Sequence, residues 1–282
     1  MTDYRFRLVN VFTTEATLSG NPLCVFEDAR GLDTATMQAL TLQFNLSETT
    51  FVLPSGTASA RVRIFATAGE MPFAGHPTLG TAHVVRQLRG LGTDLSLEMQ
   101  AGVIPVTFDG ERYALTANAA TTRPPAPTRD ELATMLGLTS TDLGDGVQWV
   151  STGNEQLLVP LKSGAALRRA APVPALASRW ANDRGMVKIY CFVDAPGATL
   201  PVRFFFSTNT GAIAEDPGTG SACANLGGWW LAMNRTLPWS VTLHQGDHLG
   251  RACRLFLDVG ADRTIRVGGR VIEIASGAVR LS

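Results

Sequence analysis

Two stretches about 140 residues apart decide the fold: residues 62–65 (VRIF) with 74–80 (AGHPTLG), and residues 202–205 (VRFF) with 216–221 (DPGTGS). In each stretch an apolar run typical of a strand leads into a glycine-rich turn. An apolar helical segment then follows, at 81–88 and at 222–231. The residues differ but their order is the same, so the sequence predicts two copies of one strand–turn–helix–strand unit.

Strand signals dominate the rest of the chain, and helices are few. Runs such as 156–161 and 188–193 are rich in β-branched and aromatic residues. Helices are expected at 33–44, capped by Asp33, and at 128–136, capped by Thr128. This mixture predicts an α+β fold rather than alternating βα units.

A proline-rich segment separates two halves of similar length. It covers residues 119–129 (AATTRPPAPTR), where three prolines within four positions exclude a helix or a central strand. We therefore expect a domain at 1–118, an extended linker at 119–129 and a second domain at 130–274.

Composition narrows the class of protein. The 282 residues are 45% hydrophobic, and Lys plus Arg equals Asp plus Glu at 24 each. No excess of positive charge is present to gather nucleic acid or a membrane surface, and no long apolar run indicates a signal peptide or a membrane span. The four cysteines lie far apart without a CxxC motif, so we expect buried, structural thiols in a cytoplasmic protein.

Glu48 is the first candidate for chemistry. It lies in residues 45–49 (NLSET), between Phe44, Leu46, Phe51 and Val52. A carboxyl group desolvated by such neighbours has a raised pKa and can both take and return a proton near neutral pH. The alternative is an ordinary surface turn.

The two glycine-rich turns are the second candidate. Each precedes an apolar helix, whose unpaired N–H groups and positive dipole end favour an anion such as a carboxylate. Fixed donors of this kind stabilise the negative charge that develops when a proton is removed beside a carboxylate. His76 could donate a hydrogen bond or relay a proton, and Asp216 could hold an amine or hydroxyl. Either residue could instead be a cap or turn residue.

Four motifs in order resemble the successive signatures of the PhzF family, and they span residues 8 to 250. The motifs are residues 10–13 (NVFT) with 20–22 (GNP), 45–49 (NLSET), 71–80 (MPFAGHPTLG) and 216–222 (DPGTGSA). The resemblance implies a fold like that of diaminopimelate epimerase. That fold has two pseudo-symmetric domains, each an antiparallel sheet wrapped around a central helix, with the active site in the cleft between them. It also implies that the last strand, at about 275–282, returns to the first domain, and that the protein is a homodimer.

The resemblance also implies roles for single residues. Glu48 matches the family's acid/base, and His76 and Asp216 match its other polar active-site positions. The residues expected to bind the substrate are Asn21, Ser47, Gly75, Gly220 and Ser221. The best-known family reaction isomerises trans-2,3-dihydro-3-hydroxyanthranilate in phenazine biosynthesis, but membership does not name the metabolite. We expect a cofactor-independent proton shift on a small carboxylate-bearing substrate, with dihydroaromatic amino acids among the candidates.

Rival interpretations are an epimerase or racemase of the same fold and a non-catalytic carboxylate-binding protein. A two-cysteine racemase needs a thiol at each glycine-rich turn, where this sequence has Ala74 and Pro217, and Cys223 should already lie inside the helix. Residues 244–248 (HQGDH) lack a third metal ligand, and no dinucleotide or P-loop motif is present. We therefore expect neither a metal nor a cofactor.

Overall fold

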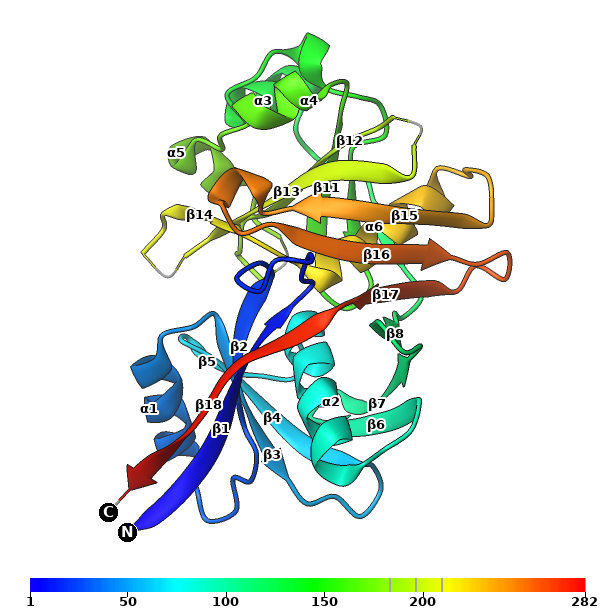
Figure 1. Ribbon diagram of the computed structural model, residues 1–282. Helices are drawn as coiled ribbons and strands as arrows, with labels where there is room; N and C mark the ends of the chain where they lie inside the picture. The colour runs from blue at the N-terminus through cyan, green and yellow to red at the C-terminus, as the bar shows by residue number, and fades with distance from the viewer. Residues whose placement is uncertain (183, 196, 209, 282) are drawn as a thin grey trace. The chain divides into compact units, whose positions relative to one another are not determined.

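The computed structural model describes residues 1–182, 184–195, 197–208 and 210–281 (Figure 1). By its internal contacts the chain forms two compact units. The N-terminal unit contains Met1–Thr116 and Gly268–Ser282, and the C-terminal unit contains Ala117–Val267. Three residues in the predicted linker, Thr121–Arg123, form strand β9, which pairs with a strand of the C-terminal unit.

The N-terminal unit is a mixed sheet that curls around one helix. Neighbouring strands follow the order β18–β1–β2–β3–β4–β6–β7–β8, with β5 also pairing with β4, and only β2–β3 and β4–β6 among these pairs are parallel. The strands are β1 Thr2–Val11, β2 Asn21–Phe26, β3 Glu48–Leu53, β4 Ala60–Ala66, β5 Gly69–Met71, β6 Asp94–Met99, β7 Gly102–Phe108, β8 Tyr113–Thr116 and β18 Val271–Leu281.

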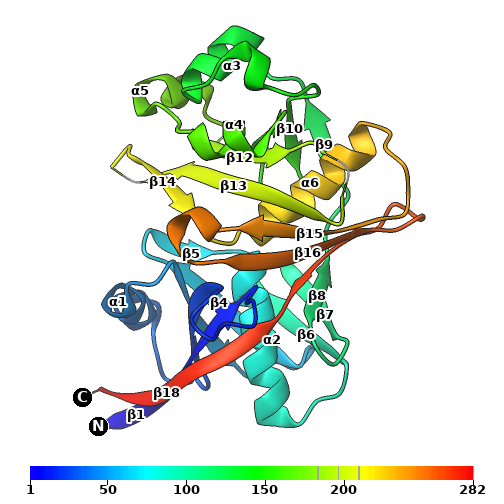
Figure 2. The same cartoon turned by 45° about the horizontal axis from the view of Figure 1, so that its top comes forward.

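Helix α2 (Gly75–Arg89) occupies the inside of this sheet and contacts strands from β1 to β8 (Figures 1 and 2). Its first three turns are buried, whereas its last turn carries Arg86 and Arg89. Helix α1 (Thr34–Phe44) covers the outer face through Met37 and Leu40, and Asp33 caps it as predicted. The two chain ends lie side by side because β18 pairs with β1.

The C-terminal unit repeats this plan around helix α6 (Gly220–Ala232). Helices α3 (Arg129–Met135), α4 (Gly164–Arg169) and α5 (Pro174–Ala177) pack on the outer face of its sheet, and α3 begins with the predicted capping box of Thr128 and Glu131. Its strands are β9, β10 Gln148–Ser151, β11 Gln156–Leu161, β12 Lys188–Val193, β13 Thr199–Ser207, β14 Ile213–Asp216, β15 Trp239–Gln245, β16 Cys253–Val259 and β17 Ile265–Gly269, the last of which runs into the N-terminal unit. Short 3-10 turns lie at Ser140–Asp142, Ser178–Trp180 and Asp247–Leu249.

The strand pairing confirms the internal repeat. The series β2 to β7 pairs parallel, antiparallel, antiparallel, parallel and antiparallel, and the series β11 to β16 pairs in the same way. One row of paired residues crosses β3, β4 and β5 and consists of Thr50, Ile64 and Met71. The equivalent row across β12, β13 and β14 consists of Tyr190, Phe204 and Asp216. Ile64 therefore corresponds to Phe204, as the match of 62–65 with 202–205 predicts.

The prediction of a helix beginning at residue 81 was wrong, because α2 already begins at Gly75. Pro77 lies in the first turn, where its missing N–H would have no partner within the helix. Glycine and proline therefore mark a helix start here rather than a preceding turn. Helix α6 likewise begins earlier than expected, at Gly220.

All four cysteines are buried and free, and Cys223 lies inside α6 as expected. Burial raises the pKa of the Cys191 thiol to about 12 and raises that of the other three as well. Within the part of the chain that the structure describes, no helix combines the length and the apolar character that a membrane span requires.

Candidate active site

Glu48 is the first residue of β3. Helix α1 ends at Phe44, and Asn45 reverses the chain in a left-handed conformation with φ of 51°. The side chain of Glu48 is 17% exposed, so the carboxyl group is largely, but not fully, removed from water. Ser47, immediately before it, is exposed in the connecting turn.

His76 brings an imidazole to this carboxyl group from the first turn of α2. Its Nε2 lies 3.4 Å from Oε2 of Glu48, and the residue is only 6% exposed. Burial lowers the pKa of His76 to about 3, although a hydrogen bond to the carbonyl of Pro22 acts in the opposite direction. The imidazole is therefore neutral at pH 7.

The hydrogen bond to Pro22 also fixes which nitrogen carries the proton. Nε2 makes no hydrogen bond with the described residues, so the nitrogen that donates to the Pro22 carbonyl is Nδ1. In a neutral ring with Nδ1–H, the other nitrogen is an acceptor. Nε2 thus presents a lone pair, and not a proton, to the Glu48 carboxyl group.

Asn21 begins β2 at the same end of the sheet, because β2 and β3 run parallel with Cys24 opposite Thr49. Asn21 is 1% exposed and follows Gly20, whose φ is +84°. A β-carbon on Gly20 would lie 2.7 Å from the carbonyl oxygen of Val11, so this turn needs glycine. The N-terminal unit therefore gathers Asn21, Glu48 and the start of α2, with Gly75 and His76, at one end of its sheet.

In the C-terminal unit, Asp216 ends β14, and Gly220 and Ser221 begin α6. Thr219, the N-cap residue, donates its hydroxyl proton to Oδ2 of Asp216 instead of capping the helix. The buried Gln245 holds this arrangement by donating to the carbonyl of Asp216 and, at 2.9 Å, to the Thr219 hydroxyl. The carboxylate is thereby fixed as an acceptor for a positively charged or donor group.

Thr219, not Pro217, corresponds to Ala74. Both are the N-cap residues of their helices, and both have extended backbones. The two turns are equally long, residues 72–74 before α2 and residues 217–219 before α6, so Pro217 corresponds to Pro72 and not, as the sequence comparison had it, to Ala74. Neither cap residue is a cysteine, so the argument against a two-thiol racemase is unchanged.

Helices α2 and α6 differ from α1, α3 and α4 in how they begin. Asp33, Thr128 and Ser163 each accept a backbone N–H at the starts of α1, α3 and α4. Neither Ala74 nor Thr219 makes such a side-chain cap. Backbone donors at these two helix starts are therefore available to an anion in addition to water.

A comparison with protein families decides the relationship. The model of the PhzC-PhzF family, described as phenazine biosynthesis-like protein, matches residues 9–277. The chain belongs to the PhzF family. An uncharacterised isomerase of Pasteurella multocida is 39% identical over 280 residues, covering 98% of this chain and 94% of that protein. The trans-2,3-dihydro-3-hydroxyanthranilate isomerase of Pseudomonas aeruginosa is 34% identical over 265 residues, covering 90% and 89%. This chain is thus an isomerase of the PhzF family.

The structural comparison agrees on the fold. A crystal structure of a PhzF-family phenazine biosynthesis protein from Bacillus anthracis superimposes with a TM-score of 0.85 at 24% identity, covering 100% of both chains. This likeness shows the α+β fold of two repeated units.

Sequence reasoning missed three polar residues of this PhzF-family chain. Gln156 and Lys188 begin β11 and β12, and Asn225 lies in α6. Lys188 occupies the same place in β12 as Glu48 does in β3. Lys188 comes directly before Ile189, which pairs with the parallel strand β11, and Glu48 comes directly before Thr49, which pairs with the parallel strand β2. One sequence signal could have drawn attention to this region: Gly153-Asn154, just before β11, repeats the Gly20-Asn21 pair at the start of β2.

Proposed function

We propose that this PhzF-family isomerase moves a proton between two carbon atoms of a small carboxylate-bearing substrate, with Glu48 as the general acid/base. The observation that carries the proposal is the 3.4 Å approach of His76 Nε2 to the partly buried Glu48 carboxyl. Once Glu48 has taken a proton, the lone pair of the neutral imidazole is placed to receive that proton in a hydrogen bond, so the pair can hold it between the two transfers.

In the proposed reaction the Glu48 carboxylate removes a proton from a substrate carbon. The C–H bond breaks, its electron pair enters the conjugated system, and negative charge develops on the substrate's carboxylate oxygens. Backbone N–H donors at an uncapped helix start would stabilise that charge. The protonated Glu48 then returns the proton to a second carbon, and the carboxylate is regenerated. One carboxyl group completes the cycle, so the proposal requires no cofactor.

The proposed substrate class is a dihydroaromatic amino acid. The relative from Pseudomonas aeruginosa acts on trans-2,3-dihydro-3-hydroxyanthranilate by its name. In this chain, Asp216 is held as a hydrogen-bond acceptor, which suits an amine, and the uncapped helix starts suit a carboxylate. Asn21 and Ser47 are further proposed substrate contacts. The homodimer and the cytoplasmic location expected from the sequence remain predictions, and light scattering tests the first.

Replacement of Glu48 by Gln tests the proposal. Glutamine keeps the size of the side chain but cannot cycle a proton, so we expect turnover to fall by ~10²- to 10⁴-fold while binding is retained. Turnover and deuterium incorporation from heavy water are measured on dihydroaromatic amino acids.

The matched control is Glu70→Gln in β5, which removes a carboxylate paired with Arg63 in the same unit. It should leave turnover near the wild-type value. A folded Glu48→Gln protein with wild-type turnover would remove Glu48 from the mechanism. Affinity without proton exchange in the wild-type protein would identify a binding protein instead of an enzyme.

A further inference from the structure

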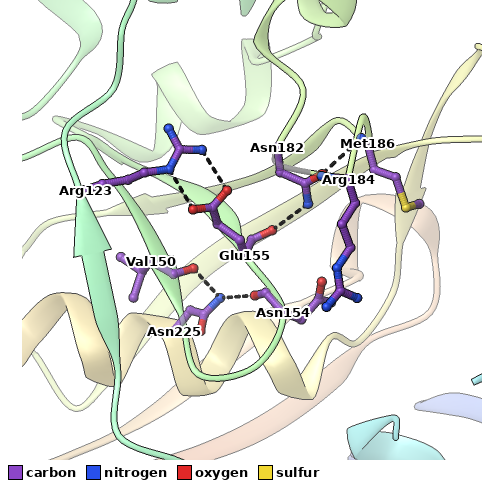
Figure 3. Close-up of polar contacts among 8 residues, drawn as sticks. All are labelled: Arg123, Val150, Asn154, Glu155, Asn182, Arg184, Met186 and Asn225. Carbon is purple, nitrogen blue, oxygen red and sulfur yellow. Dashed lines mark hydrogen bonds and ion pairs between the residues drawn. The ribbon is translucent and has the colours of Figure 1, made fainter. Parts of the chain in front are cut away.

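Asn225, in the first half of α6, is a fully buried amide whose orientation is determined by the backbone. Its Oδ1 accepts from the backbone N–H of Thr152 at 2.8 Å. Its Nδ2 donates to the carbonyls of Val150 at 2.9 Å and Asn154 at 2.8 Å (Figure 3). A backbone N–H only donates and a carbonyl only accepts, so the amide cannot be turned over without losing these bonds.

The orientation of the Asn225 amide determines the orientation of the Gln156 amide. The same Nδ2 lies 2.8 Å from Oε1 of Gln156, which is also fully buried. Gln156 must accept on this side, and its Nε2 therefore donates to Oγ of Ser221 at 2.9 Å. Since the Ser221 hydroxyl accepts from Gln156, its own proton points to another acceptor.

The surroundings of Ser221 favour an acceptor that carries negative charge. Ser221 is the second residue of α6, and Thr219 provides no side-chain cap. Lys188 occupies the neighbouring register position to Gln156, because Leu157 pairs with Ile189 in parallel strands, and its ammonium donates to Oδ1 of Asn154 at 2.8 Å. The C-terminal unit thus carries a cation where the N-terminal unit carries Glu48.

Tyr190 provides an independent sign that this end of α6 receives a ligand. It follows Lys188 by two residues on β12, so the two side chains share the face of the sheet that packs on α6. Its hydroxyl is completely buried and makes no hydrogen bond with the described residues. The register places Tyr190 opposite Phe204, which lies opposite Asp216, four residues before α6. Burial raises the pKa of Tyr190 well above its usual value, and Cys223 and Asp216 add to this increase.

We propose that Asn225 and Gln156 are positioning residues that hold Ser221 as a hydrogen-bond donor, so that the start of α6 binds the substrate's carboxylate and rejects its amine. This inference rests on the proposed function and assigns one of its two polar subsites. The amine then belongs to Asp216, which is fixed as an acceptor by Thr219.

A purely structural role for Asn225 is the competing explanation. Its bonds to residues 150–154 hold the loop before β11, which is also anchored by Asn182 to the Glu155 carbonyl at 3.2 Å and by the Arg123–Glu155 ion pair (Figure 3). Replacement of Asn225 would disturb this loop as well as Ser221. Gln156 is the better test, because glutamate has the same shape.

Gln156→Glu should reverse the direction of the hydrogen bond between residue 156 and the Ser221 hydroxyl. At a pH above the pKa of the introduced carboxyl group, which burial raises, the carboxylate has only acceptors, so one oxygen still accepts from Asn225 while the other accepts the Ser221 proton. We expect the dissociation constant for sulfate to rise at least tenfold. The probe is sodium sulfate, and the readout is the increase in Tm over a titration, with sodium chloride at equal ionic strength as the reference.

Two further variants make the result decisive. Gln148→Glu introduces the same change on β10, where the amide contacts the sulfur of Met233 at 3.6 Å, and it should bind sulfate within twofold of wild type. Ser221→Ala should weaken sulfate binding, and adding Gln156→Glu to it should cause no further loss, because Gln156 acts through Ser221. Wild-type affinity in Gln156→Glu, or additive losses in the double variant, would overturn the proposal.

Glu48→Gln separates this inference from the proposed function. It should retain sulfate binding, because Glu48 is not needed to hold the anion. Loss of turnover in Glu48→Gln together with loss of anion binding in Gln156→Glu supports both proposals. Normal turnover in Glu48→Gln with weakened sulfate binding in Gln156→Glu removes the catalytic proposal and keeps the positioning role.

Discussion

At the scale of single residues, burial controls the chemistry of the Glu48–His76 pair. The sequence predicts desolvation of Glu48 by its apolar neighbours, and the structure adds a more deeply buried partner. His76 is 6% exposed, and its pKa is lowered to about 3. A histidine that stays neutral cannot stabilise a carboxylate by charge, which is why we propose that Glu48 moves the proton and that His76 receives a hydrogen bond only from the protonated carboxyl group.

The lowered pKa of His76 predicts a pH-dependent stability. The unfolded chain has a histidine pKa of about 6.5, so between pH 6.5 and 3 the unfolded state binds the additional proton. The free energy of unfolding should therefore fall as the pH decreases through this window. His76 should contribute a loss of about 1.4 kcal/mol between pH 7.5 and 5.5. Urea unfolding at the two pH values measures this.

His76→Asn should lose that part of the pH dependence, because asparagine does not titrate in this range. His83, whose pKa burial lowers to about 4, should keep a residual slope in both proteins. His248→Asn, at an exposed position, is the control and should follow the wild-type curve. Equal slopes in His76→Asn and wild type would show that His76 is accessible to protons in the folded protein.

At the scale of elements, the turn that carries Asp216 is supported by a glycine 30 residues further along the chain. Gly246 has a φ of +77°, and a β-carbon there would lie 2.6 Å from the carbonyl oxygen of Pro217 and also overlap the carbonyl of Arg251. Both obstacles are backbone atoms, so neither can move aside as a flexible side chain would. Gly246 thus lets two loops approach closely enough to place Asp216 beside Thr219.

Gly246→Ala should consequently lower the free energy of unfolding by more than backbone strain alone would. Gly250 lies in the same loop with a φ of +68° and no atom within 4 Å of its β-carbon position, so Gly250→Ala measures the strain of the left-handed conformation, roughly 1 kcal/mol. Gly246→Ala should lose at least about 2 kcal/mol of unfolding free energy, since overpacking adds to that strain. It should also lower turnover. Chemical denaturation measures both variants, and equal losses would refute the close approach.

At the scale of the whole molecule, the cysteines are part of the two hydrophobic interiors. Cys24 packs with Phe26, Phe51 and Phe65 in the N-terminal unit, and Cys191 belongs to the core beneath α3 and α4 in the C-terminal unit. Burial raises the pKa of every thiol, so almost no reactive thiolate exists at pH 7. The chemistry of the protein should therefore be independent of its thiols.

We expect the folded protein to resist a thiol reagent such as 5,5′-dithiobis(2-nitrobenzoate) and to remain active in its presence. Denaturant should release four reactive thiols per chain. Absorbance of the released nitrothiobenzoate and residual turnover are the two measurements. Rapid labelling of one thiol in the native protein with complete loss of activity, reversed by reduction, would instead indicate an active-site cysteine.

The sequence by itself determined the features that depend on neighbouring residues. The caps at Asp33 and Thr128 and the apolar strands follow from local patterns, and the match of 62–65 with 202–205 predicted the repeat. Only the tertiary structure decided which buried polar groups meet. Gln156 reaches Ser221 across 65 positions, and His76 reaches Glu48 only because α2 starts at the end of the sheet where β3 begins. Hydrogen bonds of this kind depend on strand register and helix placement, which no local pattern specifies.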